Sequence, residues 1–143
     1  MIKYFRIYEL VDKQTYETYK EQAWEFFTTD ILDTLTGVRE LFDSPITVNN
    51  WWWGGLYKYR GLRSKQKSAE LGSPKSEHRY EDSHLCNAID CDIKGYTAEQ
   101  ARQLILRNVD NPKISKLMRM EANTNWLHFD CKQGKPRIYL FHV

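Results

Sequence analysis

The chain has 143 residues and a formal net charge of +2, with 28% charged and 41% hydrophobic residues. This length and composition predict one soluble globular domain over residues 1–143. The near balance of charge disfavours a nucleic-acid partner. The first residues interrupt their apolar positions with charged ones, so we expect neither a secretion signal nor membrane insertion. Three cysteines, an odd number, predict free thiols in a reducing compartment.

The first half of the chain is predicted to hold a strand, two helices and a second strand. Residues 2–11 alternate in side-chain direction and predict a strand. Apolar residues at helical spacing predict helices over 15–27 and 29–43, the second of which ends before Pro45. The β-branched and aromatic residues 46–53 predict a strand that two glycines terminate.

The second half is predicted to alternate between strands and one helix. Residues 57–83 are the most polar part of the chain and form a long connection, which in compact domains is often functional. Residues 87–93 predict a strand, and a short helix begins at Thr97, with Gln100 placed to complete a capping box. Residues 125–143 predict two strands joined by a turn. The order of elements indicates an α+β fold with helices packed on a small antiparallel sheet.

Strand alternation separates candidate metal ligands from core residues. In AIDCDI, Asp90 points to the face opposite Cys91, which lies with the isoleucines. In WLHFDC, His128 points away from Cys131, which lies with leucine and phenylalanine. Asp90, His128 and one histidine of the preceding loop would leave a fourth position for water, as in catalytic zinc sites. A structural site of Cys86, Cys91, His128 and Cys131 would need ligands from both faces of each strand, and we discount it.

Short motifs give the chain a family resemblance. Four residues occur in the family's order: Arg63 in GLRS, His78 in SEH, Asp90 in AID and His128 in WLH. They match an arginine in G-x-R-S, then S-x-H-x-x-G-x-A-x-D, then W-x-H. The chain therefore resembles the zinc D-alanyl-D-alanine peptidases of the VanY and VanX type, including compact phage-encoded peptidoglycan peptidases. The similarity extends over roughly residues 30–143.

The resemblance implies a Hedgehog/DD-peptidase fold and a zinc ion held by His78, Asp90 and His128. It implies hydrolysis of a peptide bond in bacterial peptidoglycan, as a D-Ala-D-Ala carboxypeptidase or an endolysin-type endopeptidase. Arg63 would stabilise the oxyanion or hold a substrate carboxylate. We expect a monomer encoded by a phage or prophage, made in the cytoplasm of the bacterial host and acting on cell-wall peptides.

The identity of the first histidine ligand is open, because the family leaves six residues between that histidine and the aspartate. His78 leaves eleven residues before Asp90, and His84 leaves five. The flanking GSPKSEH favours His78, with EDSHL as an insertion; the near-normal spacing favours His84. A loop absorbs extra residues at little entropic cost, whereas a deletion beside a ligand shifts the geometry, so we favour His78.

The general base is also open, because the family's acidic residue shortly before the last histidine is replaced here by asparagine and tryptophan. Glu121 lies seven residues before His128 and could reach back if the intervening residues form a turn. Asp130 shares a strand face with His128 but lies about 7 Å along it, and Asp92 is a third candidate. We favour Glu121. The alternative function is a catalytically weak or inactive phage structural or cell-wall-binding module of the same fold.

A nucleic-acid-binding function would have to use the WWW run and the basic residues that follow it. On the predicted strand Trp51 and Trp53 share one face opposite Trp52, so part of the run is expected to be core. Together with the weak net charge, this disfavours single-stranded nucleic acid as a partner.

Overall fold

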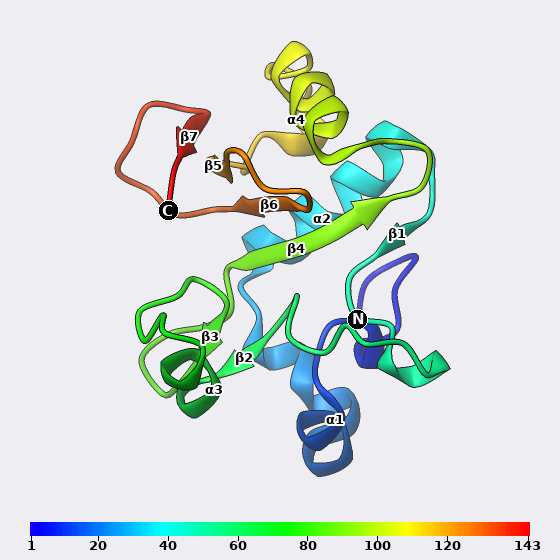
Figure 1. The fold of residues 1–143 in the computed structure, drawn as a ribbon, viewed down its shortest axis with the longest axis vertical. Helices are drawn as coiled ribbons and strands as arrows, with labels where there is room; N and C mark the ends of the chain where they lie inside the picture. Colours follow the sequence, from blue (N-terminus) through cyan, green and yellow to red (C-terminus); the bar gives the residue numbers. More distant parts are fainter.

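A five-stranded mixed sheet forms the centre of the computed structural model, which describes residues 1–143 (Figure 1). The strand order is β1-β4-β6-β5-β7, and every neighbouring pair is antiparallel except β5 with β7. The α+β class is confirmed, but the prediction of a purely antiparallel sheet is wrong. The strands are β1 (Ile46–Thr47), β4 (Ala88–Ile93), β5 (Arg119–Glu121), β6 (Leu127–Asp130) and β7 (Tyr139–Phe141).

The chain also contains four α-helices and four 3-10 helices. None of them has the length and hydrophobicity needed to cross a lipid bilayer. The α-helices are α1 (Lys13–Tyr19), α2 (Thr29–Phe42), α3 (Lys65–Glu70) and α4 (Ala98–Arg107). The 3-10 helices are η1 (Ile7–Glu9), η2 (Lys20–Phe26), η3 (Trp51–Trp53) and η4 (Pro112–Ile114).

Helix α2 covers one face of the sheet and forms the core with it (Figure 1). The hydroxyl of Thr28 caps its first turn by accepting from the Ile31 amide at 3.0 Å. The predicted apolar stripe is buried, and the sheet meets it with alternate residues of β4 and β6. All three cysteines are free, as predicted, and the predicted core positions of Cys91 and Cys131 are confirmed; Cys86 is buried as well. The opposite face of β4 and β6 is therefore the one available to polar side chains.

Helix α4 begins with the predicted capping box and stabilises a turn that the site requires. Thr97 Oγ1 accepts from the Gln100 amide at 3.1 Å, and Gln100 Oε1 accepts from the Thr97 amide at 2.9 Å. The buried Arg102 of α4 donates to the carbonyls of Thr124 at 3.0 Å and Trp126 at 3.4 Å. These bonds fix the turn between β5 and β6.

The predicted connection over residues 57–83 contains a second small sheet. Strand β2 (Arg63–Ser64) pairs with β3 (Arg79–Tyr80) in parallel, and α3 forms the crossover between them. This unit lies beside the N-terminal end of β4 (Figure 1).

The predicted N-terminal strand is wrong, because the segment turns where a strand would continue. The Glu9 carboxylate accepts from the Arg6 amide at 2.7 Å, and the Leu10 amide donates to the Ile7 carbonyl at 2.9 Å. These local bonds close η1, while Phe5, Ile7 and Leu10 still enter the core. Buried and less buried residues alternate only from Tyr4 to Tyr8, and no neighbouring strand pairs with the segment.

The predicted strand over residues 46–53 is wrong beyond β1. The Trp53 amide donates to the Asn50 carbonyl at 3.1 Å, and the Asn50 side chain accepts from the Tyr57 amide at 2.9 Å. This loop bends the three tryptophans into η3, where Trp52 and Trp53 are 47% and 65% exposed. The predicted division of the tryptophans between two strand faces therefore does not apply.

Two further predictions need correction. Strands β6 and β7 do not form a hairpin, because the unpredicted β5 lies between them and pairs with both. The helix predicted over 15–27 is α-helical only in its first half, since Lys20 has a positive φ of 49° and η2 follows.

We expect Gly37→Ala to destabilise the protein, because α2 packs directly on η4 at this residue. A Cβ on Gly37 would overlap the carbonyl oxygen of Lys113. Overpacking of this kind costs about 1–3 kcal/mol of unfolding free energy, which urea denaturation would measure. Thr29→Ala, at an exposed position of the same helix, is the control, and equal stability of the two variants would contradict the close packing.

Candidate metal centre

The pairing of three strands places polar side chains in one row across the sheet. In the β4–β6 register, Asp90 lies directly opposite His128. The β5–β6 register pairs Met120 with Phe129, so the next residue, Glu121, comes opposite His128 from the other side. Directly opposite residues have Cβ atoms about 5 Å apart. Asp90, His128 and Glu121 therefore lie side by side on the face that α2 leaves open.

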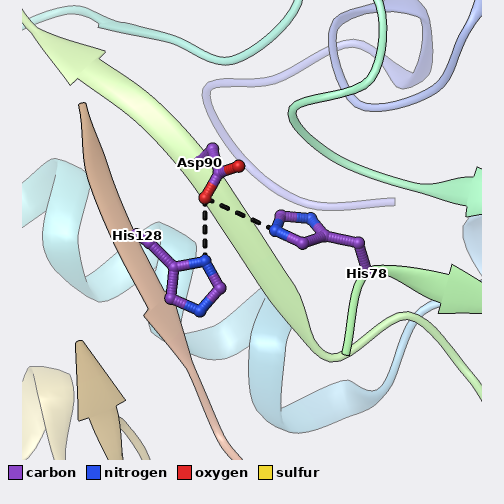
Figure 2. Close-up of side chains that lie close together, drawn as sticks. All are labelled: His78, Asp90 and His128. Atoms are coloured by element: carbon purple, nitrogen blue, oxygen red, sulfur yellow. Dashed lines mark hydrogen bonds and ion pairs between the residues drawn. The ribbon is translucent and has the colours of Figure 1, made fainter. Parts of the chain in front are cut away.

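His78 reaches this row from the smaller sheet. It immediately precedes β3, and its carbonyl accepts from the Arg63 amide at 2.9 Å as β2 and β3 pair. Figure 2 shows the two imidazole rings approaching one carboxylate oxygen of Asp90. His128 Nδ1 lies 2.8 Å and His78 Nε2 lies 3.4 Å from Asp90 Oδ1. All three residues are buried, and their candidate ligand atoms lie within 4.8 Å of one another.

The rival histidine, His84, lies outside this cluster. Its Nε2 is 3.5 Å from a carboxylate oxygen of Glu77, and its Nδ1 is 2.9 Å from the Arg79 carbonyl. The backbone bonds of Glu81 and His84 to each other close a tight turn. The segment EDSHL thus forms a side loop, and the structure brings His78 rather than His84 to Asp90 and His128.

A hydrogen bond from outside the cluster fixes the ring of His78. Its Nδ1 lies 2.8 Å from the carbonyl oxygen of Gly61, which can only accept, so Nδ1 carries the proton and Nε2 presents a lone pair. Burial lowers the pKa of His78, which favours this neutral form. His78 is therefore in the tautomer that a metal ligand requires.

His128 is held by carboxylates at both ring nitrogens. Its Nε2 lies 2.8 Å from Asp130 Oδ2, opposite the contact of Nδ1 with Asp90. Burial alone would lower the pKa of His128, but the bonds to Asp130 and Asp90 outweigh it and raise the pKa to about 9. Burial likewise opposes ionisation of Asp90, yet the hydrogen bond from the protonated ring of His128 holds the pKa of Asp90 well below its usual range.

The role of Asp130 as an outer partner of His128 was missed in the sequence, although both residues were placed on one strand face. The two side chains lean together and close the spacing of about 7 Å expected along a strand. Arg119 holds the fully buried Asp130 through Nε at 2.9 Å and Nη2 at 2.8 Å. The H-x-D spacing of His128 and Asp130 is the sequence feature that could have indicated this contact.

The donor set suits a metal ion. Two imidazole nitrogens and one carboxylate oxygen converge on one point, and each histidine uses its other nitrogen for an outer hydrogen bond. A metal bound at His128 Nδ1 would replace the proton now shared with Asp90, so binding would release a proton. The buried cluster of His78, Asp90 and His128 could therefore hold a metal ion.

Arg63 and Glu121 line the same cavity of about 290 Å³ as the three clustered residues. Arg63 donates through Nη2 to Asp90 Oδ2 at 3.3 Å and through Nε to the Tyr59 carbonyl at 2.8 Å, and its Nη1 makes no hydrogen bond within the protein. Partial burial raises the pKa of Glu121, and its carboxylate forms no hydrogen bond or ion pair. Every predicted site residue thus faces one cavity.

The other two candidate bases have carboxylates that are already engaged. Asp92 forms two bonds of 3.0 Å with the guanidinium of Arg60. Asp130 is buried between Arg119 and His128. Among the three candidates, Glu121 alone has a free carboxylate in the cavity.

No model of a protein family matches this sequence, and neither a curated protein nor a solved structure matches it.

We expect His78→Ala to abolish binding of a divalent metal, whereas His84→Ala retains it. Only His78 contributes a ligand atom to the cluster, while His84 bonds within its own loop. Metal content after incubation with Zn²⁺ and dialysis measures the difference. Loss of metal in the His84 variant and retention in the His78 variant would reverse the assignment.

We expect Asp130→Asn to weaken Zn²⁺ binding about 10- to 100-fold, the usual effect of losing an outer partner of a ligating histidine. The amide would remove the charge that holds the Nε2 proton of His128. Competition with a chromophoric chelator measures the affinity. Asp92→Asn, which alters a carboxylate outside the cluster, is the matched control; equal affinities would show that Asp130 does not act on the metal ligand.

Proposed function

We propose that the protein is a zinc peptidase that hydrolyses peptide bonds of bacterial peptidoglycan, with a Hedgehog/DD-peptidase-like fold. The observation that carries this proposal is the convergence of His78, Asp90 and His128 in one cavity with Arg63 and Glu121. Two histidines and one carboxylate are the protein ligands of several catalytic zinc sites, which leave a further position open. The motif order shared with zinc D-alanyl-D-alanine peptidases supports the cell wall as the source of the substrate.

Zinc at such a site lowers the pKa of its water and polarises the scissile carbonyl. Glu121 is the group that takes the proton from the attacking water and returns it to the leaving amine. Three features support this role: Glu121 lies opposite His128, its carboxylate is unengaged, and burial raises its pKa toward the range useful for a base.

Arg63 is the group that stabilises negative charge on the substrate. Its Nη2 contacts Asp90, so the guanidinium is oriented before substrate arrives, and Nη1 remains available for a new hydrogen bond. A delocalised, permanently charged guanidinium suits a developing oxyanion.

An inactive wall-binding module of the same fold is the competing function. Its basis in the sequence was the missing acidic residue close to His128. The place of Glu121 on the neighbouring strand supplies a carboxylate by another route, which supports catalysis.

We expect the wild type to bind one zinc ion per chain and to release peptides from purified cell walls. Glu121→Gln should keep the zinc and lose activity by about 10²- to 10⁴-fold, the usual contribution of a general base. Metal analysis and chromatography of released amines measure the two properties.

Glu25→Gln, at an exposed glutamate remote from the cavity, is the matched control and should behave as wild type. A wild type that binds no zinc would refute the metal centre. A zinc-loaded wild type that is inert on walls of both Gram-negative and Gram-positive bacteria would favour the inactive module.

A further inference from the structure

A second cavity adjoins the metal cavity on one side. The second cavity has a volume of about 370 Å³ and shares Asp90 and Trp126 with the first. Its other lining residues are Tyr57, Arg60, Asp92 and Asn125. Asp90 and Trp126 therefore contribute to the walls of two neighbouring cavities.

The second cavity offers aromatic surface without a free charge. The Arg60 guanidinium is paired with Asp92 through two bonds of 3.0 Å and lies 4.1 Å from the centre of the Tyr57 ring. Tyr57 and Trp126 remain 43% and 37% exposed. With its cation neutralised, the cavity suits an uncharged segment of peptide better than a terminal carboxylate.

Hydrogen bonds hold the backbone of both aromatic residues. Tyr57 and Asn50 form two hydrogen bonds. The Tyr57 amide donates to the Asn50 side chain at 2.9 Å, and the Asn50 amide donates to the Tyr57 carbonyl at 3.1 Å. The Trp126 carbonyl accepts from Thr124 Oγ1 at 2.7 Å and from Arg102. Because these bonds hold the backbone of both residues before binding, little backbone ordering remains for a ligand that contacts them.

Away from Trp126, the metal cavity is lined by free positive charges. Lys75 and Lys132 line it, are exposed, and form no ion pair within the protein. The third cation there, Arg119, is neutralised by the buried Asp130. The two lysines are therefore free to bind an anionic group.

The ends of β6 place these two regions on opposite sides of His128. Trp126 immediately precedes β6, and Lys132 follows the last residue of β6 by two. At about 3.3 Å per residue the four residues of β6 are roughly 13 Å long. An extended peptide of about four residues spans this length.

We propose that the cleft binds an internal segment of a peptide, with an uncharged part between Tyr57 and Trp126 and a carboxylate-bearing residue at Lys75 and Lys132. This assignment rests on the proposed peptidase function and makes it an endopeptidase. The substrate chain extends past the metal ligands in both directions, and no free cation lies in the aromatic cavity to select a chain end.

The test measures binding of blocked peptides to the zinc-loaded Glu121→Gln protein, so that cleavage does not interfere. The probes are C-amidated heptapeptides of alanine whose N-terminal amine carries fluorescein in an amide bond. Each has D-alanine at the centre and one glutamate or one glutamine, placed in separate peptides near the N-terminal or the C-terminal end. Fluorescein anisotropy gives each affinity. The double variant Lys75→Gln/Lys132→Gln should bind the better glutamate peptide about fivefold more weakly and the glutamine peptide unchanged.

Tyr57→Ala and Trp126→Ala should weaken both peptides about tenfold, and Trp126→Phe should restore most of the affinity. Lys58→Gln and Trp53→Ala change residues of the same types outside both cavities and are the controls. Thermal melts identify any variant that fails to fold. If an alanine variant does not fold, the affinity of Trp126→Phe or Tyr57→Phe is measured in its place.

Equal binding by all variants would overturn the assignment, and so would binding that requires a free C-terminal carboxylate. The outcome is separable from that of the proposed function. Peptide binding in the expected pattern by a protein that cleaves no cell wall would retain the cleft and refute the peptidase. Wall cleavage without the expected binding pattern would support the peptidase and refute the assignment of the cleft.

Discussion

The antiparallel pairing of β4 with β6 is the constraint on which the rest of the site depends. Its register sets Asp90 opposite His128, and Ile89 opposite Phe129 on the face that α2 covers. Because side chains alternate with a period of two, a slip of one residue would move the apolar set to the cleft and the ligands into the core. Burial of the apolar face against α2 therefore selects the same register that assembles the ligand pair.

Within that register, the two histidines are oriented by groups outside the cluster. A backbone carbonyl holds His78, and the Arg119–Asp130 pair holds His128. Such a cluster is costly to bury unless its charges are compensated. Here Asp90 is compensated by Arg63 and by the protonated ring of His128. The same contacts that stabilise the metal-free protein also leave one nitrogen of each ring directed at Asp90.

Predictions from the sequence succeeded where the pattern was local and failed where structure depended on distant partners. The alternation in AIDCDI and WLHFDC was enough to separate Asp90 and His128 from the core cysteines, since the period of a strand is a property of the strand itself. The N-terminal segment and the tryptophan run were mistaken for strands because side-chain to backbone bonds of Glu9 and Asn50 turn them. Strand β5 has only three residues and exists by pairing with β6 and β7, so the place of Glu121 stayed conditional.

Eleven residues lie between His78 and Asp90, and the loop within them sets the position of neither residue. His78 is positioned by the pairing of β2 with β3, and Asp90 by β4, so neither ligand depends on the loop between them. Before β4 begins, the Asn87 amide donates to the Glu77 carbonyl at 2.7 Å, which closes the loop at its base. The intervening residues form a side loop whose closure entropy grows only logarithmically with length. The base of the loop is thus held whatever its length, and His84 bonds within the loop instead of joining the cluster of His78, Asp90 and His128.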